Sequence, residues 1–149
     1  MDINILKRKG IEGALFGSNR DEIRSNFTCP LTSFKAQAWD VIESDYYDDA
    51  FLRLSYDEEL KLSNIGILPH GSVYFDGCKL DVKNLKTLLN KLKSLGFKFG
   101  KIEQGYYFDE LGLCISYEGK FVTAIELYMG KYEDLLQVTL SRASAYYSE

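Results

Sequence analysis

Two segments of the chain, 46–57 and 107–118, carry the same pattern of apolar and polar residues and align without a gap. Five of the twelve aligned pairs are identical, and four more are conservative exchanges. In both segments large apolar residues alternate with other side chains, which is the period of a half-buried strand. Acidic or glycine-bearing residues follow each segment, and a second stretch with strand character comes next, at about 60–68 and 121–128. The pattern therefore predicts two β-hairpins.

A helical pattern and a short glycine-bounded segment precede each predicted hairpin. The clearer helix has leucines at i, i+3, i+4 and i+7, with an expected N-cap before them and a glycine just past the expected end (Leu85, Leu88, Leu89 and Leu92; Asp81; Gly96). The earlier helix is expected near 19–27 with Ser18 as its cap, and it ends before Pro30 because a residue preceding proline is disfavoured in helical geometry. A third helix is expected at about 132–145.

These elements predict an α+β protein, built as a tandem repeat of helix plus antiparallel β-hairpin. The hairpins are expected to merge into one curved sheet with the helices on one face. The two pseudo-repeats would span about 10–68 and 71–128. Because a unit of that size buries too little surface to be stable alone, residues 1–149 are expected to form a single domain.

Composition narrows the class of protein. Of the 149 residues, 46% are hydrophobic and 27% are charged, which excludes a disordered or low-complexity chain. No apolar run is long enough for a membrane span, and the first residues have neither the basic region nor the apolar core of an export signal. Three widely spaced cysteines suggest reduced thiols. A cytoplasmic protein with no membrane partner is expected.

Charge is distributed unevenly along the chain. Residues 40–59 contain eight carboxylates and one cation, Arg53, whereas residues 79–101 contain seven lysines and one acid, Asp81. These stretches are either solvated surfaces or, for the acidic one, a surface that attracts a basic partner. The lysines are spread along the predicted helix at 81–95, and the isoelectric point is about 5.1, so nucleic acid is not an expected partner.

The residue types that carry catalysis or hold metals do not form a recognisable set. The one histidine, His70, lies in a Pro-His-Gly turn with no nucleophile or carboxylate close to it in sequence. The cysteines lack zinc-ligand spacing, and Cys114 is expected to be buried. Glycines 10, 13 and 17 do not match a phosphate-binding loop, and the acidic residues around 45–49 do not match a calcium loop. No catalytic residue, metal site or cofactor is therefore expected.

Two adjacent tyrosines, Tyr46 and Tyr47, stand among these carboxylates. Tyrosine ringed by acidic residues suits a protein interface, since it offers rigid contact area beside charges that steer a partner. The alternative is that one tyrosine points inward and the other is merely exposed. The interface interpretation predicts these partner-binding residues: Asp45, Tyr46, Tyr47, Asp48, Asp49, Asp57, Glu58 and Glu59.

The layout resembles the immunity proteins of bacterial polymorphic and contact-dependent growth inhibition toxin systems. The likeness rests on a glycine-punctuated opening at 10–18, a short helix, a tyrosine-rich strand that ends at 54–57, and a return strand. The tandem helix-plus-sheet arrangement is also similar to the β-lactamase inhibitory protein architecture. The resemblance implies a non-catalytic, stoichiometric inhibitor, monomeric before it binds, that occludes the active site of a cognate toxin. A basic nuclease is the expected toxin type.

Two other functions remain open from the sequence. The first is a small-ligand or scaffold-binding module that uses the concave face of the sheet. The second is an enzyme whose site the sequence does not reveal. Salt dependence separates the first from an acidic inhibitor, because steering by carboxylates weakens as ionic strength rises whereas apolar capture does not.

Overall fold

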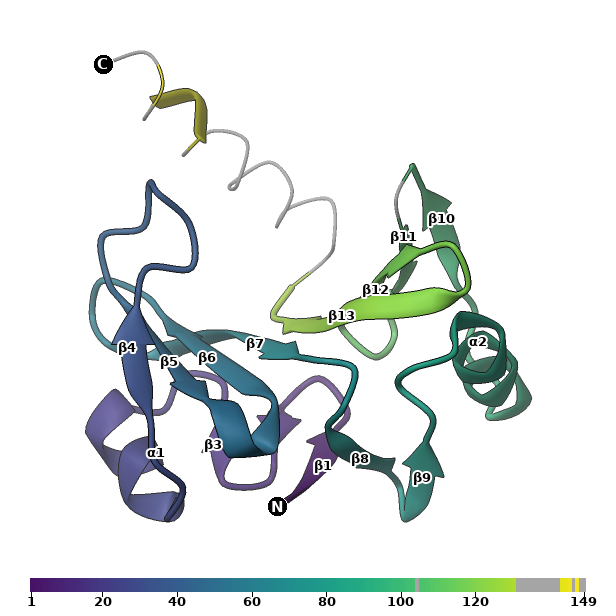
Figure 1. Cartoon of the computed structure of the whole chain (residues 1–149), viewed down its shortest axis with the longest axis horizontal. Coiled ribbons are helices and arrows are strands. Elements are labelled where there is room, and N and C mark those ends of the chain that lie inside the picture. Colours follow the sequence, from purple (N-terminus) through teal and green to yellow (C-terminus); the bar gives the residue numbers. More distant parts are fainter. Residues whose placement is uncertain (104, 131–142, 146, 148–149) are drawn as a thin grey trace.

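The computed structural model describes residues 1–103, 105–130, 143–145 and 147. Within them, strands and helices form a mixed α+β fold, as predicted (Figure 1). The elements, in chain order, are β1 (Asp2–Leu6), β2 (Gly10–Ile11), β3 (Ala14–Leu15), α1 (Arg20–Asn26), β4 (Thr32–Phe34), β5 (Ser44–Tyr47), the 3-10 turn η1 (Asp48–Ala50), β6 (Leu52–Tyr56), β7 (Leu62–Ile67), β8 (Ser72–Phe75), β9 (Cys78–Leu80), α2 (Leu85–Ser94), β10 (Gly100–Ile102), β11 (Gly105–Phe108), β12 (Leu113–Glu118) and β13 (Phe121–Tyr128).

The larger sheet is fully antiparallel and, in the described part of the chain, has eight strands in the order β10-β11-β12-β13-β7-β6-β5-β4. One run of consecutive strands, β4 to β7, forms one half, and β10 to β13 forms the other. The halves meet where β7 pairs with β13, with Ile65 opposite Leu127 and Ile67 opposite Ile125. This central pairing brings residues about 60 positions apart in sequence side by side.

A second sheet, which the sequence analysis did not predict, has the order β3-β2-β1-β8-β9. At its centre β1 and β8 run parallel, with Ile3 opposite Val73. The expectation of one continuous sheet is therefore wrong. The alternating residues of β1, with Ile3 and Ile5 buried, supply a strand that the predicted hairpins did not include. The segment at 72–75 pairs with that strand instead of adding to the larger sheet.

Helices α1 and α2 both begin at asparagine caps, not at the predicted residues. The Asn19 side chain accepts a hydrogen bond from the backbone N–H of Asp21, and the Asn84 side chain accepts one from Thr87. Asp81, the predicted cap of α2, instead accepts the backbone N–H groups of residues 83 and 84 in the turn ahead of the helix. Gly96 follows the C-cap with a φ of +94°, as expected for the residue just past a helix end.

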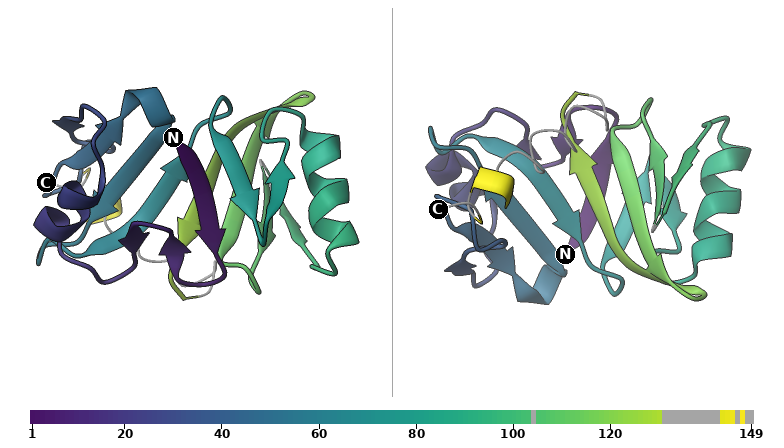
Figure 2. Two further views of the ribbon diagram at one scale, coloured as in Figure 1. Left: turned by 90° about the horizontal axis from the view of Figure 1, so that it is seen from below. Right: turned by 90° about the horizontal axis from the view of Figure 1, so that it is seen from above.

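The smaller sheet and α1 cover one face of the larger sheet (Figure 2). In the view from below they lie in front of it, and α2 stands at the opposite end of the molecule from α1. One apolar core runs through the layers and includes Ile3 of the smaller sheet, Ile23 of α1, Leu88 of α2 and Ile65 of the larger sheet. We call this covered side of the larger sheet its inner face, and the opposite side its outer face.

The repeated segments are not single strands, contrary to the prediction. In segment 46–57 the chain turns at η1 and continues through Phe51 with a φ of +55°. In segment 107–118 it turns at the aligned position, Gly112, with a φ of +67°. Each segment is therefore the end of one strand, a turn, and the next strand. The predicted return strands do match β7 and β13.

The predicted C-terminal helix at about 132–145 lies outside the described residues, except for 143–145, which are helical. Tyr147 is also described, and its ring makes an edge contact with Trp39, with 6.2 Å between centroids. Of the helices in the described chain, none is both long and apolar enough to cross a membrane.

Candidate protein-binding surface

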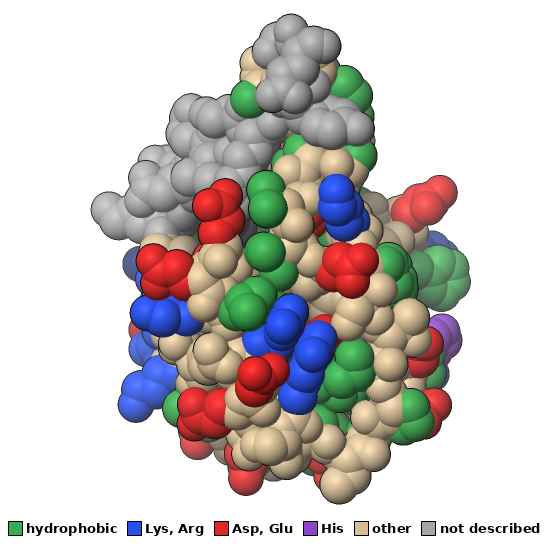
Figure 3. Space-filling model, turned by 90° about the vertical axis from the view of Figure 1, so that its left-hand side faces the viewer, with side chains coloured by type: hydrophobic (Ala, Val, Ile, Leu, Met, Phe, Trp, Pro, Cys, Tyr) green, Lys and Arg blue, Asp and Glu red, His purple; other side chains and the backbone are tan. Residues whose placement is uncertain are grey.

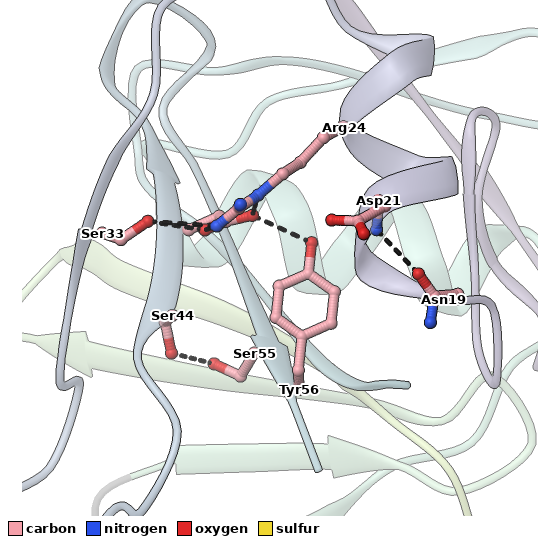
Figure 4. Close-up of polar contacts among 8 residues, drawn as sticks. Asn19, Asp21, Arg24, Ser33, Ser44, Ser55 and Tyr56 are labelled. Carbon is pink, nitrogen blue, oxygen red and sulfur yellow. Dashed lines mark hydrogen bonds and ion pairs between the residues drawn. The ribbon is translucent and has the colours of Figure 1, made fainter. Parts of the chain in front are cut away.

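Asp45, a predicted binding residue, is fully buried on the inner face, where it anchors α1 to the larger sheet (Figure 4). Arg24 of α1 donates from Nε to Oδ2 at 2.8 Å and from Nη2 to Oδ1 at 2.7 Å. The hydroxyls of Ser33 and Tyr56 complete the set, at 2.8 and 3.2 Å. Burial acts to raise the pKa of Asp45, but these donors outweigh it and hold the pKa below its ordinary value. Asp45 is a structural anion.

Tyr47 lies on the same inner face as Asp45 and is also fully buried. Its ring packs against Phe27, with 5.1 Å between centroids, and burial raises its pKa to about 12. The two residues share a face because side chains alternate along β5. The prediction placed both in a partner interface, whereas the fold encloses both. Because both are buried, Asp45 and Tyr47 cannot contact a partner directly, and they contribute only by holding β5 in place.

Tyr46, between them in sequence, points to the outer face. Its ring stacks on Phe34 of β4 at 3.8 Å between centroids, with only 5° between the ring planes. Burial raises the pKa of the Tyr46 hydroxyl, Arg53 opposes that shift, and the charges of Asp40 and Glu126 add to it. Of the two tyrosines singled out, the structure therefore makes only Tyr46 part of a surface.

The remaining acidic residues form two groups. Asp48 and Asp49 are exposed in η1, before β6, whereas Asp57, Glu58 and Glu59 are exposed in the turn after it. The five residues of β6 separate the groups by about 17 Å, at 3.3 Å per residue. The second group is partly satisfied locally, because Asp57 accepts the backbone N–H groups of residues 59 and 61, and Glu59 pairs with Lys61 at 3.3 Å. The structure thus does not assemble one continuous acidic patch.

The first acidic group lies beside an apolar strip that the sequence analysis missed. Leu31, Phe34 and Val41 are 37%, 47% and 70% exposed on and beside β4, the last strand at one side of the larger sheet. Figure 3 looks at the molecule from this side and shows hydrophobic, acidic and basic side chains interspersed. We call this surface the β4 edge, and it comprises Leu31, Thr32, Phe34, Asp40, Val41, Glu43, Tyr46, Asp48 and Asp49.

One signal in the sequence could have revealed this strip. Pro30 ends the approach from α1, and the four residues after it, 31–34, combine β-branched, aromatic and apolar side chains in the pattern of a short strand. A strand placed there lies next to 44–47 after a loop of nine residues. The pairing of Thr32 with Tyr46 then brings the tyrosine and the strip together.

The lysine-rich segment lies far from the β4 edge. Helix α2 stands at the opposite end of the molecule from β4 (Figure 1). Its basic residues face solvent, while Leu85, Leu88 and Leu92 are buried. The acidic residues at 48–49 and the lysines of α2 therefore lie far apart in the molecule.

The histidine and the cysteines lie apart from this surface. His70 is exposed in its turn, where its ring contacts that of Phe51 at 5.6 Å between centroids. Cys114 is buried as predicted, and burial raises its pKa to about 11, which makes it a poor nucleophile at neutral pH. Among the described residues, no group of three His, Cys, Asp or Glu side chains is placed to hold a metal ion.

Comparison with known proteins adds nothing to the geometry. No protein-family model, no curated protein and no solved structure matches this chain.

Proposed function

We propose that this protein is a non-catalytic, protein-binding inhibitor, an immunity protein that neutralises a cognate basic toxin of the nuclease type. In this proposal the chain is cytoplasmic, is monomeric until it binds, and consists of two copies of one helix-plus-hairpin unit. Binding through the β4 edge occludes the active site of the toxin. The proposal draws on the sequence resemblance and on one observation from the structure.

The observation is that Asp48 and Asp49 are exposed just past the end of β5, the strand whose Tyr46 is half-buried and stacks on the exposed Phe34. Neither carboxylate forms an ion pair with another described residue, so both are available to an external cation. Nucleases bind phosphate through Lys and Arg, and carboxylates beside apolar contact area can occupy such a site in place of the substrate. Phe34 and Tyr46 supply that contact area.

The small-ligand alternative has less support from the described outer face of the sheet. At its centre stand Arg53, Asn64 and Glu126, joined by hydrogen bonds of 2.6 Å. An apolar ligand would have to cover these charged groups without replacing their contacts, which is costly. The described centre of this face is therefore a polar network and not an apolar cradle.

The test is a low-salt pull-down with the tagged protein from the organism that encodes it, followed by a binding assay on what is retained. We expect a stoichiometric basic polypeptide that elutes as salt rises. Asp48→Lys with Asp49→Lys should weaken its binding about tenfold or more at low salt, with less effect at high salt. The free energy of unfolding should change by less than about 1 kcal/mol, since both residues are exposed. A protein that elutes alone, or a charge reversal without effect, contradicts the proposal.

A further inference from the structure

Within the described residues, strand β4 pairs with another strand on one side only. It is the terminal strand of the eight in the described chain, and its described backbone hydrogen bonds all go to β5. An open strand of this kind exposes unpaired N–H and C=O groups, which can template the addition of another strand. The terminal residues of β4, Thr32 and Phe34, are both exposed.

Carboxylates flank this open strand at both ends. The register places Thr32 opposite Tyr46 and Phe34 opposite Ser44, so Asp48 and Asp49 lie beyond one end of β4 and Glu43 lies beyond the other. Lys35 is the one basic residue within 31–43, a stretch that also contains Asp40. A strand added here would therefore have acidic groups near both of its ends.

The opposite end of the sheet carries charges of both signs. Strand β10 is terminal there, with Lys101 on it, Lys98 two residues before it and the exposed Glu103 directly after it. The phenol of Tyr107 lies over Gly100, where an added Cβ would come within 2.5 Å of the ring. Of these two described ends of the sheet, β4 is the one flanked by carboxylates on both sides, so it is the end that suits a basic partner strand.

We infer that the β4 edge binds an extended, basic segment of a partner protein as an additional antiparallel or parallel strand of the larger sheet. This inference rests on the proposed function and specifies how the partner is held. Backbone hydrogen bonds to β4 supply affinity, the Phe34–Tyr46 pair receives an apolar side chain on the outer face, and the flanking carboxylates receive Lys or Arg.

The experiment uses the full chain, labelled with ¹⁵N, and a capped peptide of alternating lysine and valine as the probe. We expect saturable changes in amide chemical shift confined to residues 31–35 and 43–49. Two matched peptides test the mode of binding: one with N-methyl groups on alternate residues, which removes backbone donors, and one with glutamate in place of lysine. Each should bind about tenfold more weakly or worse.

Two charge-reversed variants localise the effect. Asp48→Lys with Asp49→Lys should weaken binding of the lysine peptide about tenfold at low salt, whereas Glu58→Lys with Glu59→Lys makes the same charge change at the other end of β6 and should leave it unchanged. Shift changes centred elsewhere, or equal binding of the N-methylated or the acidic peptide, would overturn the inference. So would a free protein that forms dimers through this edge, shown by sedimentation and abolished by Phe34→Lys.

The inference and the proposed function fail in different experiments. If the pull-down yields a basic partner whose binding leaves the amide shifts of 31–35 unchanged, the strand-addition inference and the β4 edge as binding site are wrong, whereas the proposal of a protein-binding inhibitor stands. If the lysine peptide binds at β4 but no basic partner is retained, the inhibitor proposal is wrong and the strand-binding property stands.

Discussion

Arg53 on β6 reaches across the full width of β7 to Glu126 on β13, with 2.6 Å between Nη2 and Oε2. The same Nη2 donates to Oδ1 of Asn64, also at 2.6 Å. The path exists because Gly66 of β7 stands opposite both charged residues and has no side chain. This contact joins strands of the two halves of the sheet on its outer face. Burial raises the pKa of Glu126, while the bond from Arg53 opposes that shift.

The first prediction concerns Gly66→Ala. A Cβ at this position would lie 2.8 Å from Cζ of Arg53, so the guanidinium must move away from Glu126. The φ of Gly66 is not positive, and the backbone itself tolerates alanine. We expect a loss of about 1–2 kcal/mol in the free energy of unfolding, measured by urea denaturation.

The control for this prediction is a double-mutant cycle with Arg53→Ala. Once the guanidinium is gone, the three closest contacts of the methyl group are removed, and alanine is favoured over glycine within a strand. The cost of Gly66→Ala should therefore vanish or change sign in the Arg53→Ala background. An equal cost in both backgrounds would show that the glycine serves another purpose.

The second prediction concerns the buried anion. Asp45→Asn retains the shape of the side chain but removes the charge that Arg24 and two hydroxyls converge on. Breaking one side of such a pair leaves a cation without its partner; because Arg24 is 31% exposed, water compensates in part. We expect a loss of about 2–3 kcal/mol in urea denaturation. Asp48→Asn, an exposed control, should change stability by less than about 0.5 kcal/mol.

The third prediction is a pH dependence from the same residue. The pKa of Asp45 is lower in the folded protein than its ordinary value of 3.8, so the unfolded chain takes up the proton first as pH falls. The stabilisation is therefore complete above about pH 5 and decreases below 3.8 as pH falls toward the depressed folded pKa. Urea denaturation at several pH values should show a constant difference between parent and Asp45→Asn near neutrality and a shrinking one in acid.

The parent must be compared with Asp45→Asn because Glu126 changes the free energy of unfolding with pH in the opposite direction. Its pKa is raised in the folded state, so protonation of this group favours folding as pH falls. Since Glu126 is present in both parent and Asp45→Asn, its contribution cancels in the difference. A difference that grows toward acid pH would contradict the assignment of Asp45 as a stabilising anion.

Periodicity was enough to predict the elements whose burial follows from local pattern. The leucine stripe of α2 and the return strands at 62–67 and 121–128 are in this class, as is the α+β class itself. Long-range pairing was not predictable in the same way. The partner of β1 is β8, about 70 residues later, and nothing in either short segment specifies the parallel register that joins them.

The candidate surface likewise has one part that the local sequence predicted and another that depends on long-range pairing. The run of acidic residues correctly predicted that Asp48 and Asp49 are exposed. It also wrongly included Asp45, which is buried. The burial of Asp45 depends on Arg24 and Ser33, which lie outside 40–59, as well as on Tyr56, so the acidic pattern of 40–59 did not separate it from its neighbours. The exposed strip of β4 required the pairing of β4 with β5 to be known first.

Aligning the two repeated segments reveals a sequence signal for the turn inside each of them. Gly112 aligns with Phe51, and both have positive φ, yet glycine adopts that conformation without strain whereas phenylalanine does not. The glycine therefore marks a turn in the middle of the pattern that alternation alone assigned to a strand. In the first copy Phe51 adopts this conformation despite its side chain, and its ring contacts that of His70.

The last prediction tests how much of the requirement for glycine at 112 comes from the backbone and how much from packing. Gly112→Ala places a Cβ 2.7 Å from the carbonyl oxygen of Tyr128, whose N–H donates to the Gly112 carbonyl at 2.9 Å. Gly119 is a matched control: its φ is +60°, close to the +67° of Gly112, but an added Cβ meets no atom within 4 Å. Both alanine variants should lose about 1 kcal/mol from the backbone.

Only Gly112→Ala should then add the cost of displacing the end of β13, about 1–3 kcal/mol more. Thermal or urea denaturation of the two variants gives that difference directly, because the backbone contribution cancels between them. If the two variants were equally stable, close packing of the turn against Tyr128 would not be what excludes a side chain at position 112. A larger loss for Gly112→Ala instead assigns the glycine a packing role in addition to its conformational one.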